Sequence, residues 1–243
     1  MRIRVIDVET TGIPSETETH ALVEIGTCDL VQSPSGWRIE APVSTLVNPG
    51  RKIPIEAMAV HHIRDHDVAD APSPDRALLT LGEGATYFCA HNIDFERKFY
   101  AGGETPWICT FKSALRVWPD APSHSNQVLR YFLDVDAQDD FDPTLAMPPH
   151  RAGPDAYVTA FILRELIDQA SIEDMVRWSS GPALLAKVGF GKHRGKRWSE
   201  LAAIDRGYLE WIVDKSGMDD RDVRATAKHY LKIADENSNG GTT

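Results

Sequence analysis

The chain opens with an apolar run that carries two acids: residues 5–12 are Val-Ile-Asp-Val-Glu-Thr-Thr-Gly. An apolar run of this length, followed by turn-forming residues, predicts a buried β-strand. Residues i and i+2 of a strand lie on the same face, so Asp7 and Glu9 would project together from a sheet. Two such carboxylates repel each other unless a cation lies between them, and hard divalent cations prefer oxygen ligands. A strand end whose acids meet solvent is the alternative.

A second segment places an acid and two polar side chains directly after another predicted strand. The apolar residues 87–89 indicate the strand, and residues 90–99 follow it with His91, Asn92 and Glu96. The polar residues therefore come at the point where a strand ends and a short helix begins.

A third segment, residues 150–155, opens a long amphipathic helix. Val158, Phe161 and Leu166 recur at helical spacing, which predicts one largely apolar face. Pro154 suits the first helical position, and Asp155 then lies in the first turn, where the helix dipole favours a carboxylate.

The apolar pattern of the rest of the chain alternates between short strands and helices. The first three strands form an antiparallel meander, with a turn at 33–36. We therefore expect an α/β fold, a mixed central sheet with helices on both faces. Strands are predicted near 2–8, 22–31, 37–47, 86–90 and 107–110, and helices near 54–60, 74–82, 94–101, between 110 and 133, and at 154–170.

Taken in order, the three segments are D-x-E-T-T-G, A-H-N-x-x-F-acid and H-x-x-x-x-D, which resembles the DEDD exonuclease superfamily, His subtype. Residues 47–54 and 59–63 also resemble the N-P-x-x-x-I-P and A-[IV]-H-x-I segments of that family. The resemblance implies a ribonuclease H-like fold and 3′→5′ exonuclease activity. It extends over about residues 2–232 and to the exodeoxyribonuclease X-like members through segments 107–110, 116–119, 190–196, 207–211 and 228–231.

The resemblance also implies roles for the acids. Two divalent ions about 3.5–4 Å apart can stabilise the attacking and the leaving oxygen of a phosphodiester. All-oxygen ligands favour Mg²⁺, with Mn²⁺ as a substitute. A histidine that titrates near neutrality can take the proton of the attacking water, and His150 is the candidate; a capping or solvent-facing loop histidine is the alternative. The implied metal ligands are Asp7, Glu9, Glu96 and Asp155.

Other polar residues are candidates for contacting the substrate. Backbone groups of Thr10, Thr11 and Gly12 are expected to line the pocket for the terminal nucleotide. His61 resembles the substrate-side histidine of the family; a lone surface histidine is the alternative. His91 and Asn92 could orient the helix of the second segment as readily as they could touch DNA. A zinc site at residues 61–66 is not favoured, because no cysteine lies near and the histidine spacing fits no familiar site.

The second segment departs from the family at one position, because the family has Asp where this chain has Glu96. Glu keeps the charge but adds a methylene, so its carboxylate must fold back to hold the same metal. Asp94 lies two residues earlier and could compete for the role. Residues two apart on a helix point in different directions, so the prediction is Glu96.

The net charge of −10 is unusual for a protein that binds DNA. Bound cations would offset the four predicted ligand acids locally, and an enzyme that holds only a strand end needs few phosphate contacts. Residues 189–197 are rich in Gly, Lys and Arg, but their spacing and Arg197 do not fit a P-loop. This basic segment is either a phosphate contact or a solvated turn.

The length of 243 residues suits one sizeable domain and a small one. We predict an exonuclease domain over 1–178, a small C-terminal domain over 187–232, and a disordered polar tail over 236–243. The sequence has no apolar run of about 18 residues and no signal peptide, so neither a membrane partner nor export is expected. The three cysteines suit the reducing cytoplasm.

Three functional hypotheses follow. The first is a metal-dependent 3′→5′ exonuclease that acts on DNA 3′ ends, with single strands as the main substrate and duplex ends as a further one. The second is the same chemistry on RNA, because nothing in the catalytic segments recognises a 2′-hydroxyl. The third, suggested only by the departure at Glu96, is a catalytically silent nucleic-acid-binding module. The sequence does not indicate protein partners.

Overall fold

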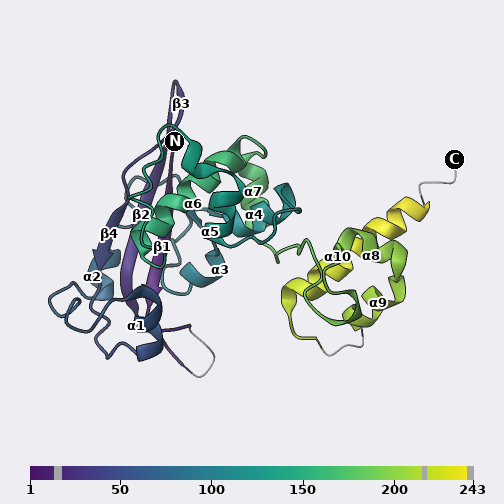
Figure 1. Ribbon diagram of the computed structural model, residues 1–243, viewed down its shortest axis with the longest axis horizontal. Coiled ribbons are helices and arrows are strands. Elements are labelled where there is room, and N and C mark those ends of the chain that lie inside the picture. Colours follow the sequence, from purple (N-terminus) through teal and green to yellow (C-terminus); the bar gives the residue numbers. More distant parts are fainter. Residues whose placement is uncertain (14–17, 215–217, 240–243) are drawn as a thin grey trace.

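The computed structural model describes residues 1–13, 18–214 and 218–239, and its N-terminal part is built on a six-stranded sheet (Figure 1). The strand order is β3-β2-β1-β5-β6, and β4 also pairs with β2. β1 is antiparallel to β2 and parallel to β5, which is parallel to β6, so the predicted mixed sheet is confirmed. The strands are β1 (Arg2–Thr10), β2 (Leu22–Ser33), β3 (Gly36–Ile39), β4 (Val43–Leu46), β5 (Tyr87–Ala90) and β6 (Trp107–Cys109).

The single strand predicted over 37–47 is wrong, because β3 and β4 are separate strands. Both pair with β2, β3 near one end and β4 near the other. The break between them contains Pro42, which lacks the N–H that a continuous ladder would need.

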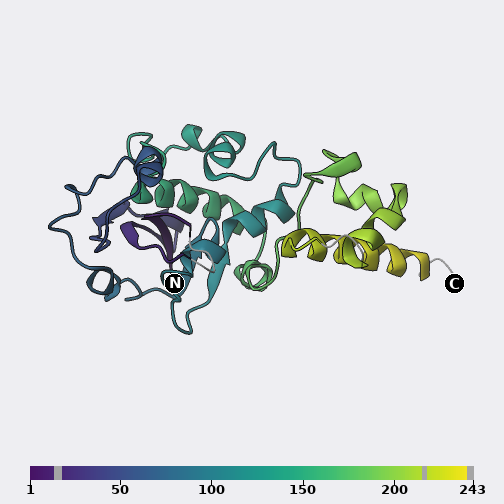
Figure 2. The ribbon, with the colours of Figure 1, turned by 90° about the horizontal axis from the view of Figure 1, so that it is seen from below.

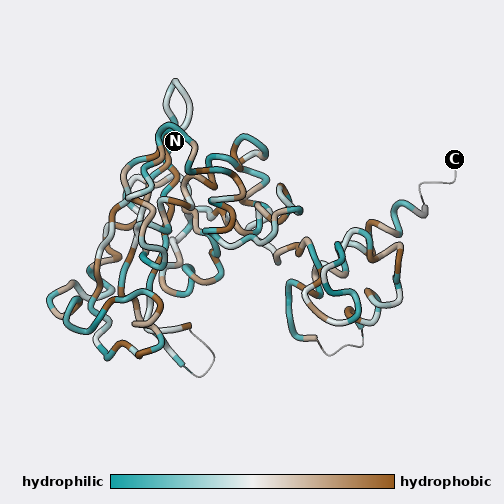
Figure 3. Tube along the Cα trace, in the orientation of Figure 1, coloured by the Kyte–Doolittle hydropathy of each residue, from teal (hydrophilic) through white to brown (hydrophobic). Residues whose placement is uncertain are grey.

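Helices cover both faces of the sheet (Figure 2). The side chains of β1 alternate between the faces: Ile3 and Val5 pack against α6, whereas Ile6 and Val8 face a second cluster that includes Leu81. Apolar residues concentrate in the strands and in the helices packed on them (Figure 3). The helices of this part are α1 (Ile55–His61), α2 (Pro74–Leu78), α3 (Ile93–Glu96), α4 (Thr110–Val117), α5 (Asn126–Phe132), α6 (Ala152–Ile167) and α7 (Ile172–Ser179), with the 3₁₀ turn η1 (Val135–Ala137).

The start of α6 approaches the sheet closely. A Cβ at Gly26 would lie 2.0 Å from the backbone of Ala152, and one at Gly153 would lie 2.2 Å from Ser44 Oγ. Gly26 is also the register partner of Asp7 on β1. The two glycines therefore allow the first turn of α6 to pack directly against the sheet, next to the part of β1 that carries Asp7.

Three helix predictions need correction. The helix predicted near 94–101 is the short α3, which ends at Glu96. Pro154 is the third residue of α6, not the first; this is tolerated because the N–H groups of a first turn have no partner within the helix. The helix is also buried nearly all round rather than on one face, because α4 and α5 pack on it as well as the sheet.

The chain after α7 continues into a separate group of helices around its own hydrophobic cluster, which includes Trp198, Leu209 and Ala227. We call this group, residues 184–239, the C-terminal body; Figures 1 and 2 show it beyond the end of α4. Its elements are η2 (Gly191–His193), α8 (Trp198–Ile204), α9 (Arg206–Asp214) and α10 (Arg221–Asn239). The domain boundaries at 178 and 187 stay a prediction about which parts fold independently.

The polar tail begins later than its composition suggests. α10 extends to Asn239, so residues 236–239 are helical, whereas residues 240–243 lie outside the described part of the chain. An ion pair between Lys232 and Glu236 at i,i+4 supports the last turns. A helix anchored in a core can continue through polar residues that would not start one.

Candidate active site

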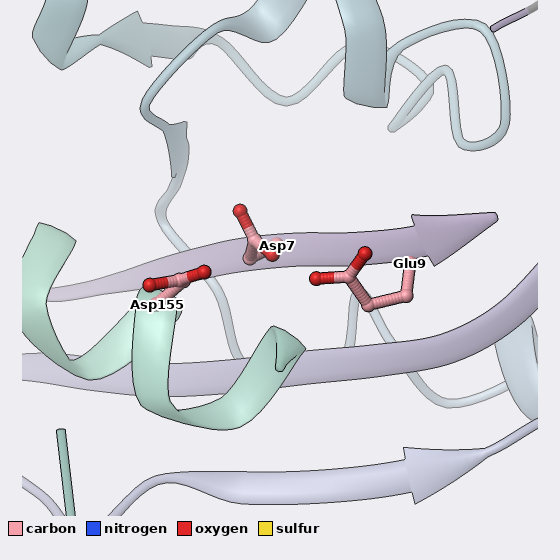
Figure 4. A group of neighbouring side chains, drawn as sticks. All are labelled: Asp7, Glu9 and Asp155. Carbon is pink, nitrogen blue, oxygen red and sulfur yellow. The ribbon is translucent and has the colours of Figure 1, made fainter. Parts of the chain in front are cut away.

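Three carboxylates meet where β1 passes under the first turn of α6. One oxygen each from Asp7, Glu9 and Asp155 lies within 4.8 Å of the others (Figure 4). Asp7 and Glu9 project from the same face of β1, as their spacing predicts, and Asp155 points at them from α6. Among the described residues, no Lys or Arg forms an ion pair with any of the three.

Burial of these acids makes their charges unfavourable. Burial, and then the charges of Asp155, Glu96 and Glu9, raise the pKa of Asp7 well above its usual range. Burial and the neighbouring Asp155 raise the pKa of Glu9 to about 8. The pKa of Asp155 is also raised by burial, although hydrogen bonds from the His150 amide and Gln127 oppose that shift. The cluster is therefore electrostatically incomplete without an added positive charge.

Asp155 is held in place by its neighbours from two elements. The His150 amide N donates to Asp155 Oδ2 at 2.8 Å, and Gln127 Nε2 donates to Oδ1 at 3.0 Å. Asn126 Nδ2 donates to the Asp155 carbonyl at 3.2 Å and to Thr159 Oγ1 at 2.7 Å. The backbone of His150 is left-handed, with φ of 59°, and its side chain is exposed at the cavity.

Glu96 and Asp94 lie in different surroundings. Glu96 is 4% exposed, and its Oε2 is buried without a hydrogen-bond partner. Burial raises its pKa to about 8, and the nearby Asp94 adds to the shift. The Asp94 side chain is 52% exposed and forms a 2.7 Å ion pair with Lys112 Nζ. Of these two acids, Glu96 is therefore the buried one whose carboxylate lacks a partner.

A cavity of about 350 Å³, which we call the catalytic cavity, joins these groups. Asp7, Glu96, His150 and Asp155 all contribute to its wall. The chemistry of the donors fits a hard divalent cation: they are carboxylate oxygens, they repel one another, and one oxygen of Glu96 is buried without a partner. Asp7, Glu9, Glu96 and Asp155 would hold such ions, and among the described residues no cluster of histidines or cysteines lies there that would favour a softer metal.

The structure places His91 and Asn92 at the catalytic cavity in different ways. His91 Nε2 donates to the His124 carbonyl at 2.8 Å, and Nδ1 lies 2.9 Å from Thr110 Oγ1. Burial lowers the pKa of His91 to about 4, so the ring is neutral and both nitrogens are engaged within the protein. Asn92 is exposed and lines the cavity. Of the two, only Asn92 has a side chain free to meet a substrate.

The other predicted substrate contacts lie at the end of β1, outside the wall of the catalytic cavity. Thr10 Oγ1 donates to the Gly12 carbonyl at 2.8 Å, and Thr11 Oγ1 accepts from the Ala21 amide at 3.0 Å. Gly12 has φ of 149°, and a Cβ there would lie 2.4 Å from the His20 ring. These contacts fix a tight turn, so a role in substrate binding stays a prediction.

His61 is not a surface residue, which removes the alternative considered for it. It is 1% exposed, and its Nδ1 accepts from the Ile63 amide at 3.0 Å. Burial lowers its pKa, and its Nε2 is buried without a hydrogen-bond partner. His61 is therefore part of the interior, and its role in substrate binding stays a prediction.

Sequence reasoning missed a buried ion pair next to the cluster. Glu24 on β2 is fully buried, pairs in register with Glu9, and accepts from Arg151 Nε at 2.9 Å and Nη2 at 2.6 Å. It also accepts from the Ala152 amide at 2.9 Å. The pair attaches the start of α6 to the sheet. Its partners are 127 residues apart, and an isolated Glu or Arg gives no signal of such a contact.

Comparison with known proteins identifies the family. The sequence model of the exonuclease family matches residues 5–163. Exodeoxyribonuclease 10 of Escherichia coli strain K12 is 34% identical over 236 residues, which covers 95% of this chain and 99% of that protein. A DNA polymerase III subunit epsilon-like protein of Rhodobacter capsulatus is 34% identical over 143 residues, covering 54% of this chain and 20% of the relative.

Comparison with solved structures also identifies exonucleases. Exonuclease X in complex with 5′ overhanging duplex DNA has a TM-score of 0.61 and 31% identity, covering 73% of this chain and 99% of that one. The nuclease domain of 3′hExo, a DEDDh family member bound to rAMP, has a TM-score of 0.51 and 18% identity, covering 69% and 92% of the two chains, and shows the shared fold alone. Across the described residues, no helix is both long and apolar enough to cross a bilayer. The chain belongs to the exonuclease family and has the ribonuclease H-like fold of its DEDDh members.

Proposed function

We propose that this protein is a metal-dependent 3′→5′ exonuclease that hydrolyses phosphodiester bonds at the 3′ ends of DNA. The observation that carries the proposal is the half-buried group of Asp7, Glu9 and Asp155, whose oxygens lie within 4.8 Å of one another with no basic partner among the described residues. Glu96 adds a fourth carboxylate, in the wall of the cavity that Asp7 and Asp155 also line. These acids would hold two Mg²⁺ ions, with Mn²⁺ as a substitute.

The residues of the site have separable tasks in this mechanism. Divalent ions, when bound, supply the positive charge that stabilises the attacking and leaving oxygens. His150 is exposed at the cavity wall and would take the proton of the attacking water at its imidazole. Asp155 keeps its orientation through the His150 amide and Gln127, so the base and a metal ligand are fixed together.

DNA is the proposed substrate because of the relatives. Exodeoxyribonuclease 10 matches nearly the whole chain, and the related exonuclease X binds 5′ overhanging duplex DNA. We therefore propose action on single-stranded 3′ ends and on duplex ends. RNA remains the second candidate, because no described side chain of the catalytic cavity is committed to a 2′-hydroxyl.

The decisive experiment uses DNA and RNA of one sequence, labelled at the 5′ end, with Mg²⁺, with Mn²⁺ and with EDTA. We expect a ladder that shortens from the 3′ end of DNA and disappears in EDTA. A matched pair of variants, Asp7→Asn and Asp94→Asn, separates the site from a contaminating nuclease: only the first should abolish the ladder. A ladder from RNA alone would change the substrate. Intact strands under every metal would leave a silent binding module.

A further inference from the structure

A second cavity, of about 510 Å³, adjoins the catalytic cavity. His91, Asn92 and Ser125 line both cavities, so the two share a wall. We call the second cavity the side groove. It runs from that shared wall past Phe111 toward Lys187, and so joins the catalytic acids to the start of the C-terminal body.

The walls of the side groove suit flat rings and one negative charge. Phe111 is half-buried and stands edge-on to the His91 ring, at 6.1 Å between centroids. Pro119 and Pro122 add apolar surface, and Lys187 is exposed at the far end. Among the described residues Lys187 has no ion pair, although its backbone is fixed by a β-bridge to Arg197.

The position of Lys187 is fixed by contacts between the two parts of the chain. Lys112 Nζ donates to the Gly181 carbonyl at 2.9 Å and to the Ser179 carbonyl at 3.3 Å, which ties the connecting segment to α4. Arg197 forms an ion pair with Asp120, the neighbour of Pro119 in the groove wall. Lys187 therefore stays at the end of the groove.

In the basic segment after Lys187, some of the charged side chains form ion pairs within the protein and others do not. Lys192 and His193 both contact Asp205, at 2.6 Å and 2.9 Å, and Arg197 contacts Asp120. Arg194 and Lys196 are exposed and have no ion pair in the described chain. In a protein with a net charge of −10, the unpaired Lys187 at the end of a groove that leads from the active site, with Arg194 and Lys196 close by in the chain, suggests an anionic ligand.

We propose that the side groove receives the single-stranded segment of the nucleic acid on the 5′ side of the nucleotide being removed. Its bases would lie against Phe111 and the prolines, and Lys187 would contact a backbone phosphate, with Arg194 and Lys196 contacting phosphates further from the end. Aromatic contact with bases and cationic contact with phosphates is how sequence-independent single-strand sites work. The inference rests on the proposed nuclease function and gives the C-terminal body a part in holding the strand.

The test compares strand lengths. We would measure kcat/KM on dT2 and dT10, with Mg²⁺ at low salt, for the full chain, for Lys187→Glu and for the control Lys228→Glu. Lys228 is exposed on α10, in the same body, and does not line the groove. We expect Lys187→Glu to lower kcat/KM about tenfold on dT10 but only about twofold on dT2. For Lys228→Glu, kcat/KM should stay within about twofold of the unaltered chain on both strands. The milder Lys187→Ala should reduce the slope of log affinity against log salt by about 0.7.

Each outcome decides one claim. Equal kcat/KM of Lys187→Glu and the unaltered chain on dT10 would overturn the inference. So would equal losses on dT2 and dT10, which would mean a general effect on the fold. If the unaltered chain cleaves neither strand, the proposed function fails. Fluorescence anisotropy of 5′-labelled dT10 would then decide the inference: weaker binding by Lys187→Glu than by Lys228→Glu supports it, and equal binding, as expected if the groove holds a peptide, rejects it.

Discussion

The carboxylates beside the two ends of strand β1 differ in whether they have a basic partner. Near its start, Arg4 pairs across the ladder with Asp29, at 2.8 Å, and Arg2 contacts the same acid; these bonds hold the pKa of Asp29 below its usual range. Near its end, Asp7 and Glu9 have no such partner, and burial raises their pKa. Beside the start of β1 the fold neutralises the acid Asp29 of β2, whereas at the end of β1 it leaves Asp7 and Glu9 without a basic partner. The unneutralised end is where an external cation is needed.

Asp7→Asn should have the largest effect on this contrast. The change removes a central charge of the cluster, so cleavage should fall below detection, a loss beyond the roughly 10²–10³-fold typical of one electrostatic group. Mg²⁺ should raise the melting temperature of the unaltered protein but not that of the variant, because binding to the folded state stabilises it. Scanning calorimetry with and without Mg²⁺ measures this. An unchanged Mg²⁺ response in Asp7→Asn would contradict the assignment.

Glu96 and Asp94 give a comparison within one short helix. Glu96→Ala should abolish activity, because it removes an acid that faces the catalytic cavity. Asp94→Ala should weaken activity only modestly, because its partner is Lys112 outside that cavity. Steady-state cleavage of single-stranded DNA by both variants tests the pair. The reverse order of effects would move the ligand to Asp94.

His150→Ala should separate proton transfer from metal binding. We expect turnover to fall by about 10²–10⁴-fold, the usual range for loss of a general base. The stabilisation by Mg²⁺ should persist, because the His150 amide still donates to Asp155 after this change. The rate is measured in single-turnover assays and the stabilisation by calorimetry. Loss of the Mg²⁺ response in this variant would argue against the assigned role.

The stability of the metal-free protein should depend on pH because of its unpaired acids. Glu9 and Glu96 have pKa values raised from 4.5 to about 8, so in the folded state they bind protons that the unfolded chain has released. Their contribution to stability is present below pH 4.5 and is lost as the pH rises through about 8. Urea unfolding in EDTA between pH 5 and 8.5 should show this fall, and Mg²⁺ should reduce it. If the free energy of unfolding in EDTA did not change over this pH range, the pKa values of these acids would not be raised in the folded state.

The smallest effect is expected at the neutralised end. Asp29→Asn leaves Arg4 in a partly buried place without its charge partner, which should cost about 1–3 kcal/mol in the free energy of unfolding. Because the pKa of Asp29 is lowered in the folded state, its stabilisation is present above the unfolded pKa of 3.8, and the deficit should shrink as the pH falls below 3.8 through the lowered pKa. Mg²⁺-dependent cleavage per folded molecule should not change, which distinguishes this end of β1 from the other.

The sequence alone determined the features that depend on local geometry. The period of two in a strand puts Asp7 and Glu9 on one face, and the position of Asp155 in a first turn follows from the chain nearby. The order of the acidic segments was enough to predict the family and the mixed sheet. These features depend on neighbours a few residues away, so a linear pattern records them.

The tertiary structure alone decided the features that depend on distant partners. Glu24 meets Arg151 across 127 residues, and Gly26 lies opposite Asp7 beneath the backbone of Ala152. The ion pair of Asp94 with Lys112, which leaves only Glu96 of the two in the cavity wall, and the bond of His91 to the His124 carbonyl also join distant parts of the chain. A buried carboxylate forms an ion pair if packing places a basic side chain beside it, and is left to bind a metal ion if packing does not. The distance between the carboxylate and that side chain cannot be read from one sequence.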